Sequence, residues 1–166
     1  ALNGLGMIAF DRDHQVEALD FFEQALSLRP NSPRVLRNKA RVLRQKDDLT
    51  PALSILRQAL SADLLAPLTW RMYVDALQEH LELPRPSRTP DSLRGADSDT
   101  RLIWRLDRIQ RSLGTKDITQ ALADCLATIE ITMRDAQLVN NTGVLVEQLI
   151  GREAGAPFFR LALLAD

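Results

Sequence analysis

Four arginines follow one another at helical spacing and could together bind an acidic group. They recur at steps of three, four and three residues, which places their guanidinium groups along one stripe of a helix: Arg34, Arg37, Arg41 and Arg44. A guanidinium can donate two parallel hydrogen bonds to one carboxylate, so an acidic segment is the natural ligand for such a stripe. The alternative interpretation of the same spacing is an ordinary solvated face of an amphipathic helix.

Other residue types with chemical potential lack the spacing that catalysis or metal binding needs. The acidic run Asp97–Asp99 is similar to the paired acids with which some glycosyltransferases hold a sugar nucleotide, but it directly precedes a helical pattern and is interpreted as a helix cap. His14 and His80 are far apart in the chain, and Cys125 lies on an apolar face, where a thiol acts as a small hydrophobic residue. We therefore predict a protein without catalytic residues, metal or cofactor.

The composition narrows the class of protein. The chain has 166 residues, 45% of them apolar and 26% charged, with 21 basic and 22 acidic side chains. A net charge of −1 lacks the basic excess of nucleic-acid-binding proteins, so no nucleic-acid partner is expected. No apolar run approaches the roughly 20 residues that span a bilayer. A single cysteine favours the cytoplasm, while the bacterial periplasm stays open. The chain begins inside a helical pattern, and we expect a fragment of a longer protein.

Small and large apolar residues recur with a period of 34 residues. The pairs that such a shift superposes are Gly6 and Ala40, Ala18 and Ala52, Phe22 and Leu56, and Ala25 and Ala59. Small residues allow two helix backbones to approach, and the large residue fills the gap to a neighbouring pair. Pro30 and Pro33 end one helix and begin the next, because proline lacks an N–H but fits the first helical turn. Pairs of this kind cannot bury their apolar faces alone, so they stack into a solenoid.

This pattern resembles the tetratricopeptide repeat (TPR) family, whose motif runs W-x2-L-G-x2-Y, then A-x3-F, then P. Residues 1–82 contain two such units and the leading helix of a third, which begins at Trp70, while Pro86 lies where the third alanine would be. The resemblance implies an all-α, right-handed helical-hairpin solenoid whose leading helices line a concave groove for peptides. By this mapping Arg71 follows the arginine stripe on the third leading helix. Asn38 matches one member of the set of side chains with which some TPR proteins bind a terminal carboxylate. The predicted partner-binding residues are Arg34, Arg37, Asn38, Arg41, Arg44 and Arg71.

The pattern changes after residue 83. TPR-like repeats are expected over residues 1–83, a proline-rich loop or linker over 84–99, and a further helical region over 100–166. Within that region we expect helices near 99–113, 117–135 (with Met133 on its apolar face) and 135–150; the first two could form a degenerate repeat. Residues 140–143 could interrupt the last of these. The apolar tail, 156–164, either caps the solenoid or is buried in a partner or a second copy of the chain, through Phe158, Phe159, Leu161 and Leu164.

The function expected from these features is that of a non-enzymatic scaffold or adaptor. It would hold an acidic peptide segment or a partner helix in its concave groove. Two alternatives remain at this stage. The chain could be the helical part of a larger enzyme or export machine, such as a glycosyltransferase or a polysaccharide exporter. It could also be a self-associating structural module.

Overall fold

The computed structural model describes residues 1–129 and 135–165. The described residues form nine α-helices and one short 3-10 helix, with no strand among them: α1 (Leu2–Asp11), α2 (Gln15–Leu28), α3 (Pro33–Gln45), α4 (Leu49–Ala62), α5 (Pro67–His80), η1 (Asp91–Leu93), α6 (Ser98–Gly114), α7 (Ile118–Ile129), α8 (Ala136–Ile150) and α9 (Arg152–Ala165). The predicted all-α class is confirmed. Met133, expected on an apolar helix face, lies outside the described residues.

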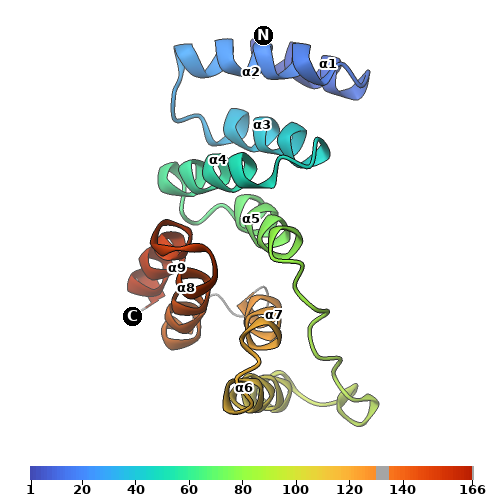
Figure 1. The fold of residues 1–166 in the computed structure, drawn as a ribbon, viewed down its shortest axis with the longest axis vertical. Helices are drawn as coiled ribbons and strands as arrows, with labels where there is room; N and C mark the ends of the chain where they lie inside the picture. The colour runs from blue at the N-terminus through green and yellow to red at the C-terminus, as the bar shows by residue number, and fades with distance from the viewer. Residues whose placement is uncertain (130–134, 166) are drawn as a thin grey trace. The chain divides into compact units, whose positions relative to one another are not determined.

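The chain divides into two compact units, each built from successive helices (Figure 1). Unit 1 is Ala1–His80 and contains α1 to α5. Unit 2 is Leu81–Asp166 and contains η1 and α6 to α9. In both units, consecutive helices pack against each other as hairpins, which is how an amphipathic helix buries its apolar stripe.

The helices of unit 1 repeat with the period read from the sequence. α2 begins at Gln15 and α4 at Leu49, and α3 begins at Pro33 and α5 at Pro67, so both intervals are 34 residues. Proline stands at the first position of α3 and of α5, where its missing N–H costs no helical hydrogen bond. The observed helices therefore confirm the TPR-like hairpin repeat.

The turn inside each hairpin is also repeated. The backbone N–H of His14 donates to Ala9 O, and that of Asp48 donates to Leu43 O, both at 2.9 Å. The residue before each donor has a left-handed backbone, with φ of 62° at Asp13 and at Asp47. Aspartate tolerates this conformation better than most residues, because its short side chain can bond locally. The same turn therefore closes both hairpins of unit 1.

A third copy of this turn closes the α6–α7 hairpin of unit 2. Asp117 N donates to Ser112 O at 2.9 Å, and the preceding Lys116 has φ of 61°. Counted from this turn, Ala121 and Cys125 take the places of the small and large residues on the other trailing helices, and both are buried. This hairpin therefore has the geometry of a repeat, although its leading helix carries Ile109 where Gly6 lies in the first repeat.

The α8–α9 hairpin is longer than the sequence pattern suggested. α9 begins at Arg152 and runs for 14 residues, so the tail expected over 156–164 is a full helix. Gly143 does not interrupt α8, because it supplies the gap in which the Phe159 ring lies: a Cβ there would be 2.7 Å from Phe159 Cε1. Ala154 and Phe158 repeat the A-x3-F spacing of α2, the second helix of the first hairpin. This spacing is the sequence signal for the full length of α9.

We predict that replacing Gly6 by alanine destabilises the chain, whereas replacing Gly4 does not. A Cβ at Gly6 would lie 2.6 Å from Phe22 Cε1, and Phe22 is fully buried, so its ring cannot easily move aside. Overpacking of this kind costs about 1–3 kcal/mol. At Gly4 nothing lies within 4 Å of the added methyl group, and the gain in helix propensity is up to about 1 kcal/mol.

Urea unfolding of the full chain, followed by circular dichroism, measures both changes. Equal free energies of unfolding for Gly6→Ala and Gly4→Ala would contradict the close approach of α1 and α2 at this point.

Candidate functional site

The leading helix is the first helix of each repeat, and in unit 1 the leading helices are α1, α3 and α5. They lie beside one another, and α3 contacts both α1 and α5. The predicted stripe on α3 faces these two neighbours. Arg37 Nη1 donates to Thr69 Oγ1 on α5 at 3.2 Å, and Asn38 Nδ2 donates to Asn3 Oδ1 on α1 at 2.8 Å. These half-buried side chains therefore connect the three leading helices.

Arg44 already binds carboxylates within unit 1. Its Nε donates to Glu79 Oε2 at 3.1 Å, its Nη2 donates to Glu79 Oε1, and its Nη1 lies 3.9 Å from Asp75 Oδ2. This is the two-pronged arginine–carboxylate geometry. About half of the Glu79 side chain is exposed, so solvent screens the pair and its contribution to stability is small.

Arg41 is exposed and lies over an aromatic ring. Its guanidinium carbon is 4.9 Å from the centre of the Phe10 ring on α1, within the range of a cation–π contact. Both residues line a shallow hollow together with Arg44, Gln45 and Glu79. The exposed guanidinium of Arg41 therefore lies beside an aromatic ring at this hollow.

Arg34 and Arg71 are exposed, and neither has a hydrogen bond or ion pair among the residues that the structure describes. The six predicted partner-binding residues thus divide into two groups. Three of them bond to neighbouring leading helices: Arg37, Asn38 and Arg44. The other three present exposed guanidinium groups: Arg34, Arg41 and Arg71. Sequence spacing had placed all of them in one stripe but could not separate these groups.

The acidic run before α6 is a helix cap. Asp97 accepts hydrogen bonds from the backbone N and the Oγ1 of Thr100, each at 2.8 Å. The bond from the backbone N–H of Thr100, followed by that from its hydroxyl, holds the pKa of Asp97 below its ordinary value. In the part of the chain that the structure describes, no three His, Cys, Asp or Glu side chains are grouped as metal ligands would be.

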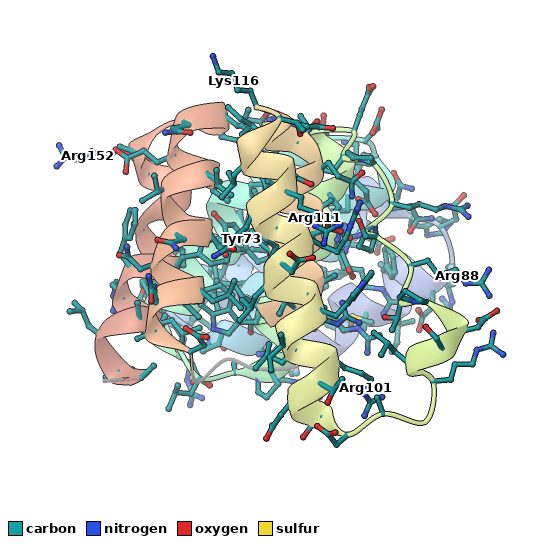
Figure 2. All side chains as sticks on the ribbon, turned by 90° about the horizontal axis from the view of Figure 1, so that it is seen from below. Tyr73, Arg88, Arg101, Arg111, Lys116 and Arg152 are labelled. Carbon is teal, nitrogen blue, oxygen red and sulfur yellow. The ribbon has the colours of Figure 1, made fainter. Side chains whose placement is uncertain are left out.

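Unit 2 contains a groove of about 670 Å³ between α6, α7 and α8. Apolar side chains from all three helices line it: Leu106, Ile109, Leu113, Ile118, Cys125, Leu138, Val144 and Leu145. Lys116 in the α6–α7 turn lies at its rim and points outward in Figure 2. This groove was not predicted from the sequence, because the pattern of the helix expected near 99–113 does not show that Leu113 is left 43% exposed.

The apolar tail, residues 156–164, also contains both buried and exposed side chains. Phe158 and Leu161 are buried, while Phe159 is half-buried against the gap at Gly143. Leu164 is 62% exposed, as is the neighbouring Leu163 at 78%. A second copy of the chain could therefore reach Leu164 directly, but it could contact Phe158 and Leu161 only if they left the core.

The comparisons with known proteins found similar solved structures and no sequence relatives. No protein-family model and no curated protein sequence matches the chain. The structure "MamA RS-1 ArsTM double mutant" is 12% identical, with 99% of this chain and 92% of that chain covered and a TM-score of 0.48. "YrrB: a TPR protein with an unusual peptide-binding site" is 17% identical, with 99% and 84% covered and a TM-score of 0.46. "Crystal structure of MamA" is 17% identical, with 97% and 94% covered and a TM-score of 0.43.

The described α-helices are 10 to 17 residues long. None of them combines the length and the apolar character that a bilayer-spanning helix needs.

Unit 2 is predicted to lose stability at alkaline pH through Cys125. Burial raises the pKa of this thiol from its ordinary value of 9.0 to about 12; a hydrogen bond with Thr142 opposes the shift and the Asp124 charge adds to it. The folded-state pKa is above the unfolded one, so the stabilising contribution is complete below pH 9 and is lost as the pH rises toward 12. The loss is at most about 1.4 kcal/mol for each pH unit.

Urea unfolding of the wild type and of Cys125→Ala at several pH values between 8 and 11 checks this prediction. The free energy of unfolding should decline less steeply with pH in the alanine variant than in the wild type. Burial also raises the pKa of Tyr73, but this contribution is the same in both proteins. Parallel declines would contradict the assignment.

Proposed function

We propose that unit 1 is a protein-interaction module whose leading helices bind an acidic segment of another protein. In this proposal Arg34, Arg41 and Arg71 pair with the carboxylates of the ligand. Arg37, Asn38 and Arg44 hold the three leading helices at a fixed spacing, so that the exposed guanidinium groups stay in register. The role is that of a non-enzymatic scaffold or adaptor.

The observation that carries the proposal is the separation of the stripe into bonded and exposed members. α3 contains five basic residues and no acidic ones, and its intramolecular partners lie on both neighbouring helices. A stripe that served only solubility would not need its members to bridge helices. Among the residues that the structure describes, Arg34 and Arg71 have no hydrogen-bond acceptor, and the contact of the Arg41 guanidinium is with the Phe10 ring.

The surface also offers apolar contact beside the charges. Met7 and Phe10 on α1 are only partly buried, and Phe10 lies next to Arg41. An exposed ion pair alone contributes about 0–1 kcal/mol, so binding needs several pairs together with apolar area. This combination favours a ligand that alternates acidic and apolar side chains over a purely acidic one.

The test is charge reversal of the exposed arginines. The triple variant Arg34→Glu, Arg41→Glu, Arg71→Glu should bind a fluorescein-labelled peptide of alternating glutamate and leucine at least about tenfold more weakly, since three pairs of about 0.5 kcal/mol each are lost and repulsion is added. Fluorescence anisotropy at low salt measures the affinity, which should also weaken as salt is added.

The matched control reverses three exposed basic residues elsewhere in the unit, Arg12→Glu, Arg29→Glu and Lys46→Glu, which lie at the ends of α1, α2 and α3. This control should bind as the wild type does. Equal loss of affinity in both variants would mean that net charge alone attracts the peptide. Unchanged binding by the triple variant would exclude Arg34, Arg41 and Arg71 as the binding residues. Circular dichroism verifies that each variant keeps its helices.

A further inference from the structure

A short extended segment of unit 2 is held on the α6–α7 hairpin by polar side chains. The segment, residues 84–90, follows α5 at the point where the 34-residue period would place a trailing helix, and it contains no helix. Three side chains hold it: Gln120 and Asp124 on α7, one helical turn apart, and Arg108 on α6.

Two of these side chains bond to the segment's backbone. Gln120 Nε2 donates to Arg85 O at 3.2 Å, and the backbone N–H of Ser87 donates to Asp124 Oδ1. One helix side chain thus satisfies a carbonyl and the next satisfies an N–H two residues along, on either side of Pro86. Gln120 Nε2 also lies 3.2 Å from Asp124 Oδ1, which fixes the amide and the carboxylate relative to each other.

The third set of hydrogen bonds is made to one side chain of the segment, that of Ser87. Ser87 Oγ donates to Asp124 Oδ2 at 2.8 Å and accepts from Arg108 Nη2 at 3.1 Å and Nε at 3.3 Å. Asp124 is only 4% exposed. Both of its carboxylate oxygens accept hydrogen bonds from the segment, and Oδ1 also accepts one from Gln120. Loss of the segment's bonds from this buried carboxylate is therefore costly.

Apolar burial plays little part in this contact. Pro84, Arg85 and Pro86 are exposed, and only Ser87 and Thr89 of this stretch are half-buried. The prolines restrict the chain to extended conformations, so little conformational entropy is lost when it is held. A contact of this type resembles recognition of an extended ligand more than packing of a structural element, which would bury apolar residues as α2 and α4 do.

We propose that Arg108, Gln120 and Asp124 form a binding site for an extended peptide segment in which a serine follows a proline, and that residues 84–90 occupy this site in cis. The ligand's backbone carbonyl and N–H are bonded by Gln120 and Asp124. The serine hydroxyl is bonded by Asp124 and Arg108. The site lies within unit 2 and shares no residue with the proposed arginine site of unit 1.

Occupation in cis determines how the site is tested. A tethered segment has an effective concentration in the millimolar range, so a free peptide competes poorly with it. Ser87→Pro removes both the N–H and the hydroxyl from the segment without altering α6 or α7. The probe is the C-terminally amidated peptide of residues 83–90 with fluorescein on its N-terminus, and anisotropy measures its binding.

The probe should bind Ser87→Pro at least about tenfold more tightly than the wild type, because the competing segment has lost its bonds. A probe with proline in place of its serine should not bind. The double variants Ser87→Pro, Asp124→Asn and Ser87→Pro, Gln120→Ala should each lose affinity for the original probe. The absence of binding to Ser87→Pro at millimolar peptide, or equal binding by the Asp124→Asn double variant, would overturn the proposal.

Tryptic cleavage after Arg88 tests occupation in cis in the otherwise unmodified chain. Figure 2 shows the Arg88 side chain projecting outward, and it is 82% exposed, so the side chain is accessible and release of the backbone limits cleavage. Ser87→Ala should speed cleavage by about tenfold, since the hydroxyl bonds to Asp124 and Arg108 are lost. The matched control Ser92→Ala, an exposed serine in η1, should cleave at the wild-type rate. Equal rates in all three chains would show that the segment is not held, and would count against the site.

Discussion

A phenylalanine ring packed against a glycine sets the separation of the helices in two hairpins of this chain. In unit 1 the Phe22 ring occupies the space that a side chain at Gly6 would need. In unit 2 Phe159 lies in the same relation to Gly143, and a Cβ at Gly155 would be 2.6 Å from Gly143 O. The backbones can approach this closely only because these glycines carry no side chain.

The packing of the leading helices against one another bears on the proposed function, because cross-helix bonds occupy some of the arginines and leave others exposed. With the leading helices of unit 1 adjacent, Arg37 and Arg44 reach acceptors on α5 and Asn38 reaches one on α1. The same arrangement leaves Arg34 and Arg71 exposed. A wider spacing would break the cross-helix bonds and turn the stripe into a set of independent charges. The proposed recognition of acidic ligands therefore depends on helix packing as much as on charge.

The fold was largely predictable from the sequence because its determinants are local and periodic. Ala18, Phe22 and Pro33 recur one period later in kind or in size, and each acts within its own hairpin. The length of α9 was not predicted. Its sequence signal is the A-x3-F spacing at Ala154, which lies far along the chain from the clear repeats.

The polar contacts were less predictable, because they join residues with no periodic relation. Ser87 and Asp124 are separated by 37 positions, and Arg108 comes from a third segment. Nothing in the local pattern distinguishes these residues from any solvated serine, aspartate or arginine. The pairing of Arg44 with Glu79 had a weak signal, since Glu79 lies 35 residues further on, about one repeat away. Periodicity alone could not show that this carboxylate would meet the stripe.

The burial of Cys125 has a practical consequence for studying the two units separately. It is the chain's single cysteine, it belongs to unit 2, and it is 1% exposed. A thiol reagent can reach it only when its hairpin opens, so the labelling rate under native conditions reports the opening free energy of unit 2 alone. Trp70 lies in unit 1 and Trp104 in unit 2, so each unit also carries its own fluorophore. Comparing thiol labelling with fluorescence would show whether the units of this chain open as one body or one at a time.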